Sequence, residues 1–223
     1  MTRRFCSANE VLQIARKACI GSGMPVDRAE DLAEAAVVLH SSGYEGLAAL
    51  LDLLREHDAN AAQIHAPVQL DLSVAKPSAQ NERLMVNHLR PQFEGVAVID
   101  WLLANPDTGV ALIRELDNGV IMIGLLVCAV QRYGGVFELQ VLSENETVKI
   151  ADLSVLTSGL PETAGWTLSY QAGAVAASSP LCHHTDIELA VWRALEKWAY
   201  LTYVPATEAS RQKGAGAGLV DND

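Results

Sequence analysis

The stretch that most constrains the fold is an apolar run from Val120 to Tyr133, which reads VIMIGLLVCAVQRY. The run is too long for one β-strand and shorter than the roughly 20 apolar residues that a membrane-spanning helix needs. A helix that is apolar nearly all round is buried inside a protein. We therefore expect a buried helix here, closed by Gly134 and Gly135, with Met122 filling gaps in the core.

The N-terminal part of the sequence is typical of three packed helices. Ser7 and Glu10 have the spacing of a capping box, and apolar residues then recur with helical periodicity until Gly21. Two further stretches, residues 26–43 and 44–57, each carry one apolar face. Because the connectors are short, the three helices are expected to pack as antiparallel neighbours in one small unit.

The middle of the chain changes character. Residues 58–92 contain three prolines, scattered Asn and Gln, and only short apolar runs. A bare loop of this length is uncommon in a compact domain, so we expect one or two short strands, or irregular structure that wraps over the helices. A short helix is predicted next, over residues 96–103, and the turn residues at 105–109 end it.

The pattern after residue 109 predicts β-structure. Residues 110–116, 136–142, 147–156 and 166–171 are strand candidates. The second and third are separated by a tight turn at Asn145 and are expected to form a hairpin. Alternation of apolar and polar residues favours an antiparallel sheet with one face in water. The predicted fold class is therefore α+β: an N-terminal helical unit followed by a mainly antiparallel sheet covered by helices.

A further helix is predicted over residues 185–203. Thr185 and Glu188 have the spacing of a second capping box, and Pro205 ends the pattern. Together with the buried helix at 120–133, this helix is expected to cover the apolar face of the sheet. Its apolar stripe consists of Ile187, Val191, Leu195 and Trp198.

These elements divide the chain into four parts. Half of its 223 residues are hydrophobic, which is ample for a buried core. We expect a three-helix unit at 1–58, an irregular connecting segment at 59–95 and an α+β region at 96–204. A glycine-rich tail at 205–223 is expected to pack on the body or on a neighbouring copy.

Charge and cysteine usage argue against several classes of partner and compartment. The sequence has 16 Lys and Arg against 27 Asp and Glu, a formal net charge of −11. Such a chain repels polyanions, so we expect neither nucleic acid nor a membrane as a partner. No apolar leader follows the basic start, and no CxxC pair is present, so we expect a cytoplasmic protein with reduced thiols. The four cysteines, expected as small buried hydrophobes, are Cys6, Cys19, Cys128 and Cys182.

A cluster of metal-competent side chains lies at residues 182–186. It lacks the ligand spacing of a zinc site, so we expect a polar loop before the last helix and no metal. The alternative is a histidine that acts as a general base near the cysteine of this cluster. The cluster consists of Cys182, His183, His184 and Asp186.

Other polar candidates have ordinary structural explanations. His40 and His57 lie near the ends of helices, where the helix dipole favours an imidazolium. Glu45, Asp52 and Glu56 accompany the third helix and form a conceivable carboxylate site, but amphipathic helices routinely expose such charges to water. We therefore expect no catalytic role for these residues.

The most specific stretch is the tail, PATEASRQKGAGAGLVDND. Its composition is also that of a flexible terminus. Its basic beginning precedes glycines whose bare amides can approach an anion closely, and its acidic end offers carboxylates to a cation, Arg or Lys. We predict that the tail is threaded through a narrow cleft, of this chain or of a neighbour. The predicted ligand-binding residues are Ser210, Arg211, Gly214, Gly216, Gly218, Asp221 and Asp223.

Three stretches carry a resemblance to a known family. They are GMPVDRAEDLAEAA, VIMIGLLVCAV and, above all, YVPATEASR followed by GAGAGLVDND. With them the chain resembles an uncharacterised bacterial family known mainly as a domain of unknown function, which ends in an SRxxGAGAGxxDND motif. The resemblance implies that these tail residues belong together, and it supplies no activity, substrate or catalytic residue.

A weaker similarity links the second and third helices to the malate and L-lactate dehydrogenase family that lacks a Rossmann fold. That family carries a Ser-His-Gly motif after its second helix. Residues 42–46 read SGYEG here, with no histidine. The catalytic role therefore does not transfer to this chain.

The leading hypothesis for function is a small-ligand-binding or accessory protein whose tail lines or docks into a site, with a small anionic ligand as partner. One alternative is a small-molecule enzyme in which Arg211 binds an anionic substrate and a carboxylate or His183 transfers a proton. Another is a structural homo-oligomer that exchanges tails between subunits. The sequence does not identify a cofactor.

Overall fold

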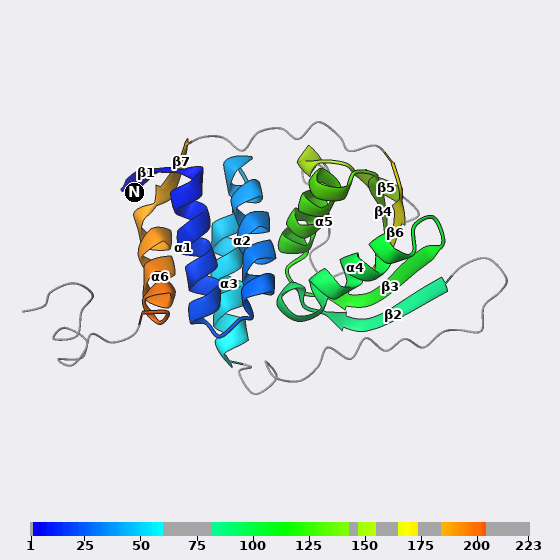
Figure 1. The fold of residues 1–223 in the computed structure, drawn as a ribbon, viewed down its shortest axis with the longest axis horizontal. Coiled ribbons are helices and arrows are strands. Elements are labelled where there is room, and N and C mark those ends of the chain that lie inside the picture. The colour runs from blue at the N-terminus through cyan, green and yellow to red at the C-terminus, as the bar shows by residue number, and fades with distance from the viewer. Residues whose placement is uncertain (1, 60–81, 143–146, 155–164, 174–183, 204–223) are drawn as a thin grey trace, which may run out of the picture.

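The computed structural model describes residues 2–59, 82–142, 147–154, 165–173 and 184–203. Their helices and strands form a helical group and an α/β group that lie side by side (Figure 1). The helical group draws on both ends of the described chain. It consists of β1 (Arg3–Ser7), α1 (Ala8–Gly21), α2 (Val26–Ser41), α3 (Gly46–Ala59), β7 (His184–Glu188) and α6 (Leu189–Tyr200).

The three N-terminal helices form as predicted. Ser7 Oγ accepts a hydrogen bond from the Glu10 backbone N–H at 3.2 Å, and Glu10 Oε2 accepts one from the Ser7 N–H at 2.8 Å. This reciprocal capping box starts α1. Gly23 and Gly43 adopt left-handed backbone angles, with φ of 93° and 88°, in the turns that follow α1 and α2. α2 packs against both α1 and α3, so the helices that the short connectors join are neighbours, as expected.

The second group is built on a five-stranded sheet, in the order β2-β3-β6-β4-β5. β2 and β3 are parallel, and the other three neighbouring pairs are antiparallel, so the predicted α+β class with a mainly antiparallel sheet is confirmed. The predicted hairpin is also confirmed, as β4 paired with β5. The strands are β2 (Glu82–Leu89), β3 (Gly109–Leu116), β4 (Val136–Val141), β5 (Thr147–Ile150) and β6 (Trp166–Gln171).

Two helical elements connect the parallel strands β2 and β3. They are η2 (Pro91–Gly95), a single π-helical turn, and α4 (Val96–Ala104), the short helix expected from the sequence. β2 itself is a strand within the segment at 58–92 for which the sequence allowed one or two. The rest of that segment, residues 60–81, lies outside the described residues, and the proposed division of the chain at residues 58, 95 and 204 stays a prediction.

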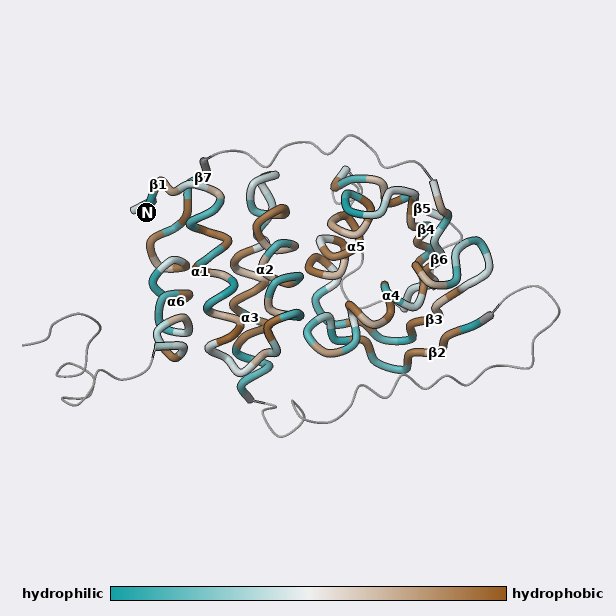
Figure 2. Tube along the Cα trace, in the orientation of Figure 1, coloured by the Kyte–Doolittle hydropathy of each residue, from teal (hydrophilic) through white to brown (hydrophobic). Residues whose placement is uncertain are grey.

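The predicted buried helix is α5 (Gly119–Tyr133), and every residue from 121 to 130 is buried. It lies between α2 and the five-stranded sheet (Figure 1). Most of its length is coloured as apolar in Figure 2. Gly124 permits this close packing, because a Cβ there would lie 3.0 Å from the Ala35 carbonyl oxygen. The Asn118 side chain starts the helix by accepting from the Ile121 N–H at 3.3 Å, and it donates to the Ala49 carbonyl of α3 at 3.2 Å.

The prediction for residues 185–203 was wrong in two respects. Residues 184–188 form strand β7 rather than a capped first turn, so Thr185 pairs with Cys6 in a strand and caps no helix. α6 begins at Leu189, with Glu188 at its N-cap position and no side-chain cap. α6 packs against α1 instead of covering the five-stranded sheet (Figure 1). Its buried residues are Trp192, Leu195 and Ala199.

Candidate functional site

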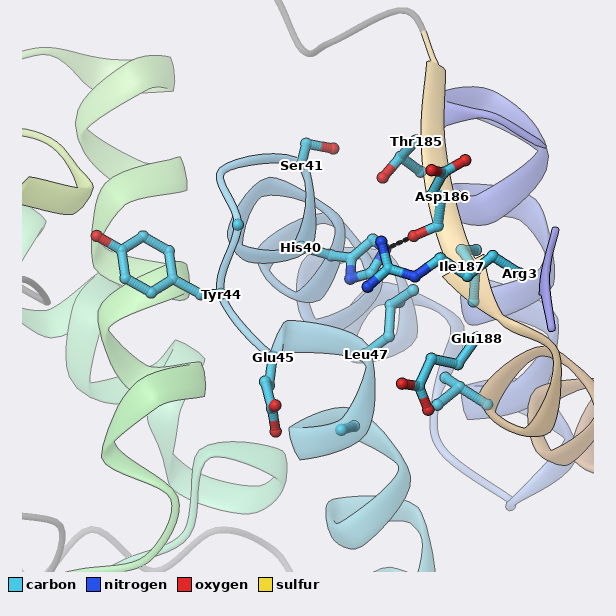
Figure 3. A pocket seen from close by; sticks show the side chains of 13 residues that line it. Arg3, His40, Ser41, Tyr44, Glu45, Leu47, Thr185, Asp186, Ile187 and Glu188 are labelled. Atoms are coloured by element: carbon cyan, nitrogen blue, oxygen red, sulfur yellow. Dashed lines mark hydrogen bonds between the residues drawn. The ribbon is translucent and has the colours of Figure 1, made fainter. Parts of the chain in front are cut away.

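A pocket of about 440 Å³ opens where the β1–β7 ribbon faces the end of α2 and the start of α3 (Figure 3). We call it the ribbon pocket. It brings together segments from both ends of the described chain, so charged side chains that are far apart in sequence meet there. The titratable and charged side chains of the lining include Arg3, His40, Glu45, Asp186 and Glu188.

The β1–β7 ribbon forms one wall of the pocket. Antiparallel pairing places Arg3 opposite Glu188. Successive residues of a strand face opposite sides, so Asp186 and Glu188 share one face, whereas Ile187 between them is fully buried. The other face of the ribbon is held by packing, since the Arg4 guanidinium lies 3.9 Å from the centre of the Trp192 ring. Burial of Ile187 and the contact of Arg4 with Trp192 thus leave the acidic side chains of the ribbon on the face toward the pocket.

His40 supplies the opposite wall, from the last turn of α2. Its Nε2 donates to the Asp186 carbonyl oxygen at 3.1 Å, the bond that is dashed in Figure 3. A carbonyl can only accept, so in the neutral ring the lone pair is on Nδ1. Burial lowers the pKa of His40 below its ordinary 6.5, and the positive charge of Arg3 lowers it further, against the opposing effect of the hydrogen bond. His40 is therefore a neutral acceptor at pH 7, and the expected imidazolium is wrong here.

The charged lining of the ribbon pocket is negative on balance. Arg3 contributes one positive charge and Glu45, Asp186 and Glu188 three negative charges, which gives −2 with His40 neutral. Within the described chain, no ion pair joins these carboxylates to a basic side chain. Ala48 and Val191, both partly exposed, add apolar surface to the lining. The pocket therefore offers negative charge beside a small apolar surface.

A second histidine, His57 near the end of α3, is buried away from this pocket. It is 1% exposed, and its ring stacks on Phe93 with centroids 5.2 Å apart. Neither ring nitrogen has a hydrogen-bond partner among the described residues. Burial lowers the pKa of His57 below its ordinary 6.5, and the positive charge of Arg28 lowers it further. The helix dipole does not keep this ring charged, because desolvation penalises the imidazolium more strongly.

We expect folding stability to fall when the pH is lowered below about 6.5, the value at which an unfolded histidine titrates. The unfolded chain then binds protons that the folded chain, with its lowered histidine pKa values, does not bind. The substitution His57→Leu should reduce this loss. Urea denaturation of both proteins at about pH 7.5 and about pH 5.5 measures the effect. A difference in unfolding free energy between the two proteins that is the same at both pH values would contradict it.

The structure brings only some of the predicted site residues together. Asp186 of the cluster at 182–186 and Glu45 of the third-helix carboxylates both line the ribbon pocket. Asp52 instead pairs with Arg55 at 2.6 Å, and Glu56 accepts from Gln92 at 3.4 Å. The three carboxylates of the third-helix region therefore do not form one site.

Several predicted residues lie outside the described part of the chain. These include Cys182, His183 and the whole predicted ligand-binding set of the tail. His184 pairs with Ser7 in the ribbon. Among the described residues, no group of three or more His, Cys, Asp or Glu side chains is arranged to hold a metal ion.

The sequence interpretation missed Arg3 and Glu188 as pocket residues. Both belong to short segments, RRFCS and HTDIE, in which polar and apolar residues do not alternate regularly, so the sequence carried no clear strand signal there. In the second segment, the capping-box spacing of Thr185 and Glu188 favoured a helix instead.

The described cysteines are structural. Cys6, Cys19 and Cys128 are buried free thiols, as expected from the sequence. Burial raises the pKa of Cys19 to about 12 and that of Cys128 still further. Only a thiolate is a good nucleophile or metal ligand, so these two side chains are unreactive at neutral pH.

Comparison with known proteins finds a family match for the N-terminal part of the chain. Residues 6–82 match the model of a family described as "Protein of unknown function (DUF3726)". This match supports the resemblance to an uncharacterised family, and it does not include the tail motif. No curated protein and no solved structure matches the chain. Among its described helices, none is both long and apolar enough to cross a membrane.

The DUF3726 match covers most of the helical group. It includes α1, α2 and α3, and therefore His40, Glu45 and Leu47 of the ribbon pocket. Arg3 and the β7 side of the pocket lie outside the matched residues. The family description assigns no activity to these residues.

Proposed function

We propose that this chain is a binding protein for a small polar molecule that carries a cationic group, which it holds in the ribbon pocket. The observation that supports the proposal is the excess of carboxylates there, three against one guanidinium, around a neutral histidine. Charged groups that share a recess attract a ligand of opposite charge. An ammonium or guanidinium group is the complementary chemistry.

The individual residues have distinct roles in this proposal. Glu188 and Glu45 accept hydrogen bonds from the cationic group, and Val191 contacts an aliphatic portion of the ligand. His40 accepts a further hydrogen bond through Nδ1, because Nε2 is already used on the Asp186 carbonyl. Arg3 favours a ligand that also carries an acceptor, such as a carboxylate. A basic amino acid or a linear diamine has the required groups.

Thermal denaturation with added small molecules tests the proposal. We expect arginine or linear diamines to raise the melting temperature in a concentration-dependent way, because a ligand that binds only the folded state stabilises it. Citrate at the same ionic strength should have no such effect. Isothermal titration calorimetry with the most effective cation then gives the dissociation constant.

Matched variants locate the binding. Glu188→Gln keeps the side-chain shape and removes one carboxylate of the pocket, so affinity for the cation should fall about tenfold, which corresponds to about 1.4 kcal/mol. Glu115→Gln makes the same change on an exposed residue of β3, away from the pocket, and should bind as the wild type does. Equal affinity in both variants, or stabilisation by citrate alone, would rule out the ribbon pocket as a cation site.

The role of the tail is a separate proposal that rests on the sequence. Ser210, Arg211 and the acidic residues at 221–223 are proposed to line or dock into a site, and an anionic ligand is proposed for the basic part. Deletion of residues 214–223 should reduce stability, oligomerisation or ligand affinity. If the truncated chain matched the full chain in all three, the tail would have no such role.

The two alternatives are distinguished by direct measurements. A homo-oligomer that exchanges tails would lose its assembly on tail deletion, which sedimentation velocity detects. An enzyme would convert a bound small molecule, so chromatography of the ligand after long incubation would reveal a product. The ribbon pocket favours the binding protein, because no nucleophile with an oriented base lines it among the described residues.

A further inference from the structure

A second hollow, of about 400 Å³, lies between α3 and α6 and is distinct from the ribbon pocket. We call it the α3–α6 groove. It combines apolar side chains with two basic ones and has no acidic residue in its lining. The lining residues are Leu51, Arg55, Ala194, Lys197, Trp198 and Leu201.

The groove continues into exposed apolar surface at the end of α6. Leu201 is 65% exposed, and Tyr200 and Tyr203 are 69% and 55% exposed. Large apolar side chains gathered at one place on the surface are typical of a binding site. Arg55 is engaged by Asp52, but both side chains are more than 60% exposed, and such exposed pairs contribute little. A second carboxylate can therefore compete for this guanidinium.

Residues 201–203, which follow α6, lie directly beside the groove. The turn after α6 is closed by the Leu201 N–H to the Trp198 carbonyl at 3.0 Å and the Tyr203 N–H to the Tyr200 carbonyl at 3.1 Å. Lys17 of α1 donates to Tyr203 Oη at 3.1 Å and lies over its ring. The point from which residues 204–223 continue is thus held next to the groove.

The end of the sequence is complementary to this surface. Residues 219–223 read Leu-Val-Asp-Asn-Asp, two aliphatic residues followed by two carboxylates. Residues 204–218 precede them and can span up to about 50 Å when extended. This reach is ample for a return to a groove beside the starting point, and the glycines at 214–218 allow tight bends.

We propose that the α3–α6 groove binds residues 219–223 of the same chain. Leu219 and Val220 contact the apolar floor at Trp198, and the carboxylates of Asp221 and Asp223 pair with the basic side chains of the groove. The proposal gives the tail-docking hypothesis a specific place, and it does not depend on ligand binding in the ribbon pocket.

The charges of the two hollows indicate which of them binds the acidic tail. The ribbon pocket carries three carboxylates and one guanidinium, so it repels an acidic chain end. The α3–α6 groove carries Arg55 and Lys197 and no carboxylate in its lining. An acidic peptide therefore favours the groove, just as a small cation favours the ribbon pocket.

A peptide-binding experiment tests the proposal. The chain truncated after Gly218 is titrated with a fluorescent peptide of residues 210–223. We expect saturable binding that weakens with salt, and at least about tenfold weaker binding to the full chain, whose own tail occupies the groove at high effective concentration. The peptide with Asp221→Asn and Asp223→Asn should bind at least about tenfold more weakly than the native peptide.

Groove variants provide the control. In the truncated chain, Lys197→Glu should weaken peptide binding about tenfold or more, whereas Arg83→Glu, the same change on an exposed residue of β2, should leave it unchanged. Absence of peptide binding, or equal effects of both substitutions, would overturn the proposal. Sedimentation of the full chain completes the test: a monomer agrees with docking in the same chain, and a dimer that Lys197→Glu dissociates would place the tail in a neighbouring copy and overturn the proposal.

Discussion

Replacement of Trp166 by alanine should destabilise the protein by about 3–5 kcal/mol, the usual cost of truncating a fully buried aromatic residue. Trp166 has no exposed surface and lies in β6, where it pairs with Ile113 of β3 and Val141 of β4. A Cβ on Gly119 would lie 3.2 Å from its ring, so the side chain also reaches the start of α5. The substitution leaves a cavity where the sheet meets the buried helix.

Urea denaturation followed by far-UV circular dichroism measures this loss. Tyr200→Ala is the matched control, because it also truncates an aromatic residue but one that is 69% exposed. The control should change the unfolding free energy by no more than about 1 kcal/mol. Similar losses in the two variants, or a loss below about 1 kcal/mol for Trp166→Ala, would show that this core is not packed as described.

The substitution Gly46→Ala should cost about 1–3 kcal/mol, although alanine is ordinarily the better helix former. Gly46 is the first residue of α3, and a Cβ there would overlap the Ala36 carbonyl oxygen and lie 2.6 Å from Leu39 Cβ of α2. Backbone atoms cannot move aside as a flexible side-chain end can, so α3 must shift away from α2. Thermal and urea denaturation report the loss.

At the nearby Gly43 a glycine is favoured by the backbone angle, whereas at Gly46 it is required by lack of space. No atom lies within 4 Å of the Cβ that a substitution would add, but the backbone has φ of 88°. Gly43→Asn should therefore cost less than Gly46→Ala, about 1 kcal/mol or less, because asparagine tolerates left-handed conformations better than most residues. If Gly43→Asn were the more damaging change, the close contact between α2 and α3 would not explain the glycine at position 46.

Local chemistry made several elements predictable. The Ser7–Glu10 capping box starts α1 where the spacing indicates, and the all-round apolar character of 120–133 identified α5 as buried. The alternation of apolar and polar residues over 136–142 and the predicted turn after it identified the pairing of β4 with β5. In each case the partner is close in sequence, or burial follows from composition alone.

The candidate site was far less predictable. The sequence predicts Asp186 in a polar loop and Glu45 among solvent-exposed charges of the third helix, yet both line the ribbon pocket. His40 and His57 were expected to be charged by the helix dipole, and burial, which a local pattern does not report, makes them neutral. The residues of the tail remain a prediction.

The sequence by itself determined the positions of most helices and strands, since capping, periodicity and turn residues act over a few positions. Only the tertiary structure decided which elements meet. β1 pairs with β7 from the other end of the described chain. α6, which was predicted to cover the sheet, packs on α1 instead and forms one wall of the α3–α6 groove. The physical reason is that an apolar stripe specifies burial but not its partner, which depends on the packing of the whole chain.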